Sequence, residues 1–206
     1  MKRSLYLASM ILLLILCAAA PVFSAEGSNA QPSQYTLGDQ TLSINVGLFV
    51  PLFLLPMQPP YTATALLAGS PPQLSLGAVG SLCWAAYVAP QVRLGVELAG
   101  NFTLSPNANT LLMLPIMGKA SYVFTFYPFE IPLSFAAGMN VVKYIDQYTI
   151  DLLLRPGASF YWIYNSSWSF GLNLNYWFDM QFDTTDSTQS RIGNFLEISL
   201  SALYHY

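Results

Sequence analysis

Apolar and polar residues alternate with a period of two along most of the chain. In the segment 168–182 the even positions carry Trp, Phe, Leu, Tyr or Met, whereas the odd positions carry Ser, Gly, Asn, Asp or Gln, with Trp177 as the exception. Segments 92–102 and 196–206 alternate in the same way. Because successive side chains of a strand point to opposite faces, the pattern predicts strands with one apolar and one polar face.

Eight segments follow this pattern, namely 40–53, 73–88, 92–103, 111–127, 132–145, 148–164, 168–183 and 191–206. Each reaches the roughly 9–11 residues that a tilted strand needs to cross a bilayer. The connections alternate between short and long, apart from the short connection 146–147. Bacterial barrels have even strand numbers, with short turns in the periplasm and longer loops outside. We therefore expect the first strand to run outward and both termini to be periplasmic.

The composition supports a membrane barrel. Hydrophobic residues make up 54% of the chain and charged residues 8%, against about 25% charged residues in a typical soluble domain. A closed sheet pairs every backbone group internally, so it can face lipid. The predicted fold is a closed up-and-down antiparallel transmembrane β-barrel over residues 40–206. A lipocalin-like soluble barrel is the alternative, but the polar faces carry Gly, Ser and Asn rather than many charges. Bulges are expected at Pro51, Pro115 and Pro156, because a closed barrel has no edge strand for proline.

The N-terminal residues 1–25 have the features of a signal peptide. Lys2 and Arg3 precede the apolar stretch 11–20, and small residues then allow cleavage after Ser24 or Ala25. A lipoprotein signal ending at Cys17 is the alternative, although Leu16 fits poorly before the modified cysteine. Residues 26–39 form a polar periplasmic leader that we expect to be mobile.

The face opposite the apolar one carries a few charges near the middle of the barrel. Glu97, Lys119, Arg155 and Glu197 lie at similar predicted depth. A charge inside a narrow, low-dielectric interior needs a partner, so we expect a polar network. Glu97 and Lys119 come from neighbouring strands and are the safest pair. The network is interpreted as a plug that stabilises the barrel, with a gate as the alternative.

Towards the predicted outer end, the inward positions become apolar. The residues concerned are Phe49, Val79, Met113, Met117, Leu153 and Trp177. They form a hypothetical pocket for a small hydrophobic ligand. The methionines would allow the wall of this pocket to adapt to the ligand. Plain packing is the alternative, because small barrels fill themselves with side chains. The connection 54–72 is also apolar and rich in proline, and it is expected to line the mouth, lie on the membrane or contact partners.

The sequence offers few residues for metal binding, nucleic-acid binding or catalysis. His205 is the single histidine, and Cys83 is the single cysteine beyond the signal segment, so no His/Cys metal site is expected. No basic run suggests nucleic acid. His205 shares a strand face with Ser199 and Ser201, but no acidic residue lies on that strand at the same depth. We therefore expect no enzyme activity, no catalytic residues and no cofactor.

Three stretches resemble consecutive strands of the small eight-stranded outer-membrane barrels of the outer-membrane protein W, X and A type: LPIMGKASYVF (114–124), IPLSFAAGMNVV (131–142) and RPGASFYWIY (155–164). The ending LSALYHY is similar to their C-terminal assembly signal, with Tyr204 and Tyr206 as its aromatic residues. The resemblance implies an outer-membrane location, with lipid and the barrel-assembly machinery as partners. The expected function is binding or passage of small hydrophobic molecules through the outer lumen. The alternative is a surface-exposed adhesin or a structural barrel that acts through its extracellular loops.

Overall fold

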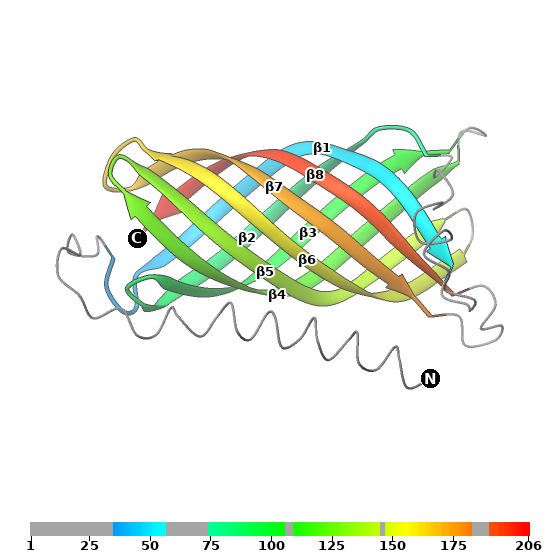
Figure 1. Ribbon diagram of the computed structural model, residues 1–206, viewed down its shortest axis with the longest axis horizontal. Helices are drawn as coiled ribbons and strands as arrows, with labels where there is room; N and C mark the ends of the chain where they lie inside the picture. Colours follow the sequence, from blue (N-terminus) through cyan, green and yellow to red (C-terminus); the bar gives the residue numbers. More distant parts are fainter. Residues whose placement is uncertain (1–34, 57–73, 106–108, 145–146, 183–189) are drawn as a thin grey trace, which may run out of the picture. The chain divides into compact units, whose positions relative to one another are not determined.

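The computed structural model describes residues 35–56, 74–105, 109–144, 147–182 and 190–206. They form eight strands: β1 (Gln40–Pro56), β2 (Gly77–Ala89), β3 (Val92–Leu104), β4 (Thr110–Phe126), β5 (Phe129–Tyr144), β6 (Gln147–Ile163), β7 (Trp168–Gln181) and β8 (Arg191–His205). Each strand pairs antiparallel with its sequence neighbour, and β1 pairs with β8 to close the barrel (Figure 1). The predicted fold class and the number of strands are confirmed.

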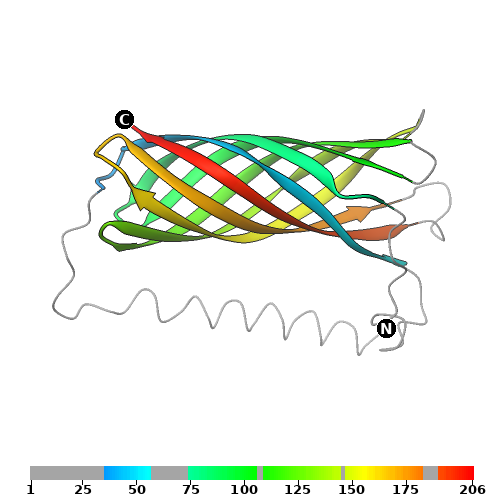
Figure 2. The same ribbon diagram turned by 90° about the horizontal axis from the view of Figure 1, so that it is seen from above.

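The barrel has a turn end and a loop end. Short connections join β2 to β3, β4 to β5 and β6 to β7 at the turn end, where β8 also finishes. The other connections leave the loop end. Figure 2 shows the strands inclined to the barrel axis, as closure of a sheet requires. No helix in the part of the chain that the structure describes is long and apolar enough to cross a membrane. The predicted signal segment 1–25 and most of the connection 54–72 lie outside the described residues.

Large apolar side chains cover the outside of every strand. They include Val46, Leu82, Leu98, Ile116, Phe135, Ile150, Leu172 and Leu200, one from each strand in order. The alternate positions of the same strands are mostly buried and point into the lumen. The facing that the alternation predicted is therefore the facing in the structure. An outer wall of this kind is suited to lipid rather than to water.

Aromatic rings gather on the outer surface near the turn end. Trp168 lies against Tyr204 with ring centroids 4.9 Å apart, and Tyr204 stacks on Tyr206 at 5.7 Å. Trp84 donates its indole N–H to the Tyr206 hydroxyl at 3.1 Å. Amphipathic rings of this kind suit the boundary between lipid and water. They correspond to the aromatic ends that the sequence places at the short turns.

The prolines disturb the sheet less than expected. A register shift occurs between Pro51 and Phe53, which confirms a bulge there. Pro115 pairs with Asn140 and Pro156 with Phe135 without any shift, so the bulges expected at these two prolines are wrong. The β6–β7 pairing omits Arg155 and Pro156 and resumes in unchanged register at Gly157. A proline removes a single N–H, so the ladder can lose one pair without an extra residue.

Candidate functional site

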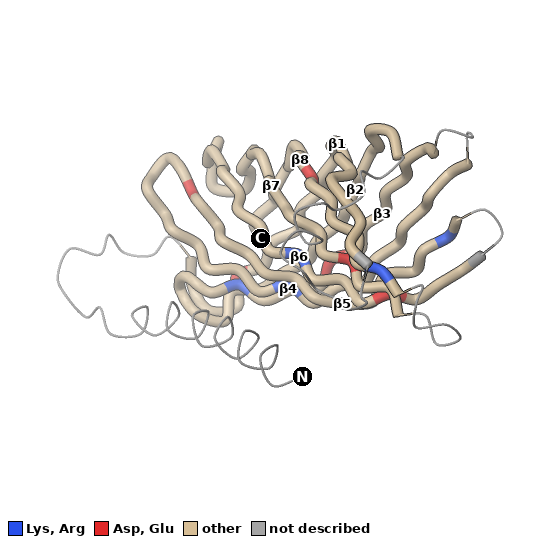
Figure 3. The backbone as a smooth tube through the Cα atoms, turned by 45° about the vertical axis from the view of Figure 1, so that its right-hand side comes forward, with Lys and Arg blue, Asp and Glu red and all other residues tan. Residues whose placement is uncertain are grey.

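An ionic network crosses the lumen near its middle. Lys119 on β4 contacts Glu97 on β3, with Nζ 3.1 Å from Oε2. Arg155 on β6 is paired with the same Glu97 carboxylate, and its Nη1 lies 3.3 Å from Oε2 of Glu197 on β8. The four residues predicted to lie at one depth therefore form one connected network. Charged positions are few along the chain, as Figure 3 shows, and these two acids and two bases balance each other.

Neighbouring side chains fix the Glu197 carboxylate. Trp177 donates its indole N–H to Oε2 at 2.8 Å, and Ser199 donates its hydroxyl to Oε1 at 2.8 Å. The Arg155 guanidinium lies over the Trp177 ring, 5.3 Å from its centroid. Arg155, Glu97 and Glu197 are each 1% exposed. Because both carboxylates have several partners, opening the network would require buried charges to be separated.

A polar ring adjoins the network on its turn side. Asn173 donates to Asn45 at 3.1 Å and to Ser199 at 3.3 Å. The Tyr161 hydroxyl lies 3.1 Å from the Asn173 side-chain oxygen and 2.9 Å from the Ser201 hydroxyl. The ring joins β1, β6, β7 and β8 across the interior, so it continues the plug towards the turns.

The loop-side half of the lumen holds an apolar cluster. It contains all six residues of the predicted pocket together with Ala99, Ala136, Val142 and Phe195. Phe49 stacks on Phe195 at 4.8 Å and meets the edge of Trp177 at 5.1 Å. Phe49, Leu153 and Trp177 are 0% exposed, so no space as wide as a water molecule adjoins them. The predicted pocket residues lie together, and in this structure they are packed against one another.

A tyrosine from the leader closes the turn end. Tyr35 stacks between Tyr87 and His205, with ring centroids 4.6 Å and 5.0 Å away. Gly38, at φ 97°, makes the turn that leads from Tyr35 into β1, and its N–H donates to the Tyr87 carbonyl at 2.9 Å. Glycine suits this left-handed conformation. Burial, with the Glu130 carboxylate nearby, raises the pKa of the Tyr35 hydroxyl, which therefore stays neutral. Residues 35–39 of the expected mobile leader thus pack on the barrel.

His205 lies beside a serine that the sequence analysis did not single out. Its Nε2 is 3.0 Å from the Ser169 hydroxyl, whereas Ser199 and Ser201 contact Glu197 and Tyr161. Ser169 is 0% exposed and Tyr35 stacks on the histidine ring. No group of three or more His, Cys, Asp or Glu side chains suited to a metal occurs among the described residues. This serine–histidine contact is buried within the end of the barrel.

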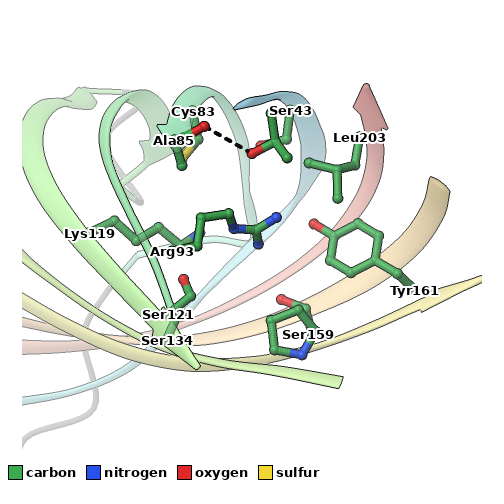
Figure 4. A pocket seen from close by; sticks show the side chains of 12 residues that line it. Ser43, Cys83, Ala85, Arg93, Lys119, Ser121, Ser134, Ser159, Tyr161 and Leu203 are labelled. Atoms are coloured by element: carbon green, nitrogen blue, oxygen red, sulfur yellow. Dashed lines mark hydrogen bonds between the residues drawn. The ribbon is translucent and has the colours of Figure 1, made fainter. Parts of the chain in front are cut away.

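A small cavity remains between the Tyr35 stack and the central network (Figure 4). Its volume is about 10 Å³, enough for about one water-sized body. Side chains from seven strands line it, and both Arg93 and Lys119 are among them. Sequence reasoning missed Arg93 as a site residue, although its polar-face position on the same strand as Glu97 was a usable signal. It also missed Tyr35 and Phe195.

These features define the class of the protein: a small eight-stranded outer-membrane β-barrel with a side-chain-filled lumen. The structure resembles that of the neisserial surface protein NspA, with a TM-score of 0.60 and 10% identity over 82% of this chain and 97% of that one. It also resembles the outer membrane protein OprG from Pseudomonas aeruginosa, with a TM-score of 0.50 and 9% identity over 84% and 97% of the two chains. At these identities the likeness concerns the fold.

One protein-family model matches residues 23–204, and the chain belongs to that family. The match spans all eight strands almost completely. No curated protein matches the sequence. The resemblance to small outer-membrane barrels is therefore confirmed at the level of the fold, and function has to be argued from the lumen and the surface.

Proposed function

We propose that the protein is a surface-exposed outer-membrane barrel whose filled lumen makes it a rigid membrane anchor, and that it acts through its loop end. The observation that carries the proposal is the order of three blocks of side chains that fill the lumen. The apolar cluster, the ionic network with its polar ring, and the Tyr35 stack follow one another from the loop end to the turn end. The name of NspA, a surface protein, is in keeping with exposure at the cell surface.

Each block is closed for a different physical reason. The apolar cluster excludes water because its side chains leave no accessible surface at Phe49, Leu153 or Trp177. The network resists opening because its charges would lose their partners in a low-dielectric interior. The Tyr35 ring fills the remaining opening by stacking. An eight-stranded barrel is only wide enough for side chains to fill it, so an aqueous porin is disfavoured.

Conductance across a planar bilayer tests the closed lumen. The mature protein should show no stepwise conductance. Tyr35→Ala and Phe49→Ala should also stay closed, since each variant removes a side chain that belongs to a single block. Stepwise conductance of the wild-type protein would overturn the anchor proposal.

Cell binding tests the loop end. Cells that display the protein should bind immobilised extracellular-matrix molecules, and replacing 57–73 or 183–189 by a short Gly-Ser segment should reduce binding while heat-dependent gel mobility shows an intact barrel. Equal binding by both loop variants and by cells without the protein would contradict action through this end.

The second candidate function is binding of a small hydrophobic molecule in the loop-side lumen, as the sequence led us to expect. The observation that favours it is the place of Met113 and Met117 in the apolar cluster, each 1% exposed. Methionine is unbranched and adaptable, so rotation of these two side chains is the easiest way to admit a ligand. The ionic network below would stop an apolar molecule, so this candidate is a binding site or a lateral route rather than a straight pore.

Quenching of Trp177 fluorescence separates the two candidates. Trp84, Trp162 and Trp168 are exposed on the outer wall, so their replacement by Phe leaves Trp177 as the reporter inside the lumen. A short bromoalkane should quench Trp177 if it enters the cluster. A matched variant that retains only Trp162 reports partition into the detergent. Quenching of Trp162 without quenching of Trp177 would reject the hydrophobic-binding candidate.

A further inference from the structure

Two buried carboxylates lie near the loop end of the lumen. Asp151 on β6 is 4% exposed and Asp179 on β7 is 7% exposed, and both lie on the inward face of their strands. The two side chains are close enough to repel each other electrostatically. Leu153, which pairs with Asp179 across the two strands, belongs to the apolar cluster. The two acids therefore border that cluster, where little water reaches a charge.

No base of the described residues forms an ion pair with either acid. The three ion pairs of the described chain all belong to the central network. Lys143 on β5 lies over the ring of Tyr148 on the outer wall, 5.2 Å from its centroid. Arg191 begins β8 beside the end of β7, and its side chain is exposed. The charge that acts on Asp179 is that of Asp151. Two buried negative charges side by side need a proton or a cation to balance them.

A third oxygen points to a ligand at the same place. Asn140 on β5 lies directly opposite Asp151 in the β5–β6 pairing and is 0% exposed. Its Nδ2 donates to Oδ1 of Asp179 at 3.0 Å, whereas its own Oδ1 is buried and has no hydrogen-bond partner. Turning the amide over would bring that oxygen against the Asp179 carboxylate, so the hydrogen bond fixes which atom is left free. A buried amide oxygen without a donor calls for a water or a cation.

The free atoms of this group are oxygens that accept. Oδ1 of Asp151 is also buried without a hydrogen-bond partner, while its Oδ2 accepts from the Thr149 hydroxyl at 3.4 Å. Directly opposed residues of antiparallel strands have Cβ atoms about 4.5–5.5 Å apart, so the free Oδ1 atoms of Asp151 and Asn140 can converge on one ion. A water would satisfy these acceptors without offsetting the charge, and a single proton would offset one charge of the two. A divalent cation does both.

We propose that Asp151, Asp179 and Asn140 form a binding site for a single calcium ion near the loop end of the lumen. Calcium takes carboxylate and amide oxygens as ligands, and its flexible coordination by about six to eight oxygens allows waters to complete the set. Its two positive charges balance the two acids. The ion ties together β5, β6 and β7, which are neighbours in the barrel (Figure 1). The site rests on these three side chains, so it stands whether the barrel acts as an anchor or binds a hydrophobic molecule.

Calorimetric titration of the wild-type protein, folded in detergent and freed of metal with a chelator, tests the site directly. Calcium should bind with one ion per chain. Magnesium should bind more weakly, because it demands near-ideal octahedral geometry and gives up its waters reluctantly. A wild-type protein that binds no calcium would overturn the proposal and leave a proton as the balancing charge. This measurement needs no variant, so it holds even where a substitution at the site prevents folding.

Stability in urea locates the ion. At constant ionic strength, the folded-to-unfolded ratio should rise about 100-fold once free calcium reaches about 100 times its dissociation constant. Asp151→Asn and Asp179→Asn should each abolish this rise. Without calcium, both variants should be at least as stable as the wild type, because each removes one of two repelling charges. Asp39→Asn is the matched control, since Asp39 binds Thr36 at the turn end, and it should keep the full response. Equal calcium responses in the wild type and the two site variants would place the ion elsewhere and refute this site.

Discussion

Replacing Glu97 by glutamine should destabilise the barrel through a loss of charge balance rather than a loss of volume. Glutamine keeps the shape of the side chain but removes the charge that Lys119 and Arg155 share. Arg155 retains Glu197 at 3.3 Å, so Lys119 is the base left without an acid. Its side chain is 15% exposed, compared with 1% for Glu97. The lumen then carries one uncompensated positive charge.

The expected cost follows from the burial. Removing one partner of a buried ion pair typically destabilises a protein by about 3–5 kcal/mol. Because the Lys119 side chain is 15% exposed, the lower half of that range is expected, about 3–4 kcal/mol. The double variant Glu97→Gln/Lys119→Met restores neutrality and leaves the Arg155–Glu197 pair intact. It should therefore recover about 1–3 kcal/mol of the loss, a coupling typical of residues in contact.

Urea unfolding of refolded protein in detergent micelles measures both values, with folded fractions read from heat-dependent gel mobility. Arg191→Gln, at an exposed position, is the matched control and should change the free energy of unfolding by about 0.5 kcal/mol or less. If the double variant is no more stable than Glu97→Gln, charge balance does not hold the network together. The cost of Glu97→Gln would then lie in its hydrogen bonds and packing.

Other substitutions test the remaining parts of the structure. Leu172→Arg places a charge on the lipid-facing wall and should cost about 2–4 kcal/mol near the bilayer midplane; normal assembly of this variant in outer-membrane fractions would contradict the facing. Phe49→Ala should cost about 3–5 kcal/mol, because the ring is buried against Trp177 and Phe195 and leaves a cavity, and urea midpoints measure it. Tyr35→Ala should cost about 1–3 kcal/mol through lost burial and stacking, and an unchanged midpoint would show that the leader does not support the barrel.

The strands were predictable from the sequence because a period of two is a local signal. Any strand that faces lipid on one side must repeat it, so the number of strands, their facing and the start of β1 at Gln40 all follow. The ends of strands follow less well. β5 begins at Phe129 rather than at residue 132, because the turn closes at Tyr127 and Pro128 and leaves Ile131 and Pro132 inside the strand. Turn geometry is set by a few backbone angles that alternation does not record.

The central network was predictable for a related reason. The number of residues from a turn to Glu97 or Lys119 gives the depth of each side chain, and neighbouring strands have fixed registers. Contacts made across the lumen have no such rule. Tyr35 lies in a polar leader without periodicity, yet its ring enters the barrel end. Phe195 shares its face with Glu197, but the apolar Leu196 beside it obscured the alternation. Such contacts depend on the closed shape rather than on any one strand.

The order of the blocks along the lumen limits what any ligand can do. Side chains of the apolar cluster can make room for an apolar ligand by changing rotamers. The ionic network, in contrast, opens only when Arg155 separates from one of its two carboxylate partners. The second process separates buried charges and is much more costly than the first. A hydrophobic molecule that enters from the loop end would therefore stop above Arg155 and leave sideways or by the way it came. Passage of a molecule from the loop end to the turn end requires the ionic network to break. Such passage should therefore first appear in variants in which both partners of an ion pair are replaced by neutral residues.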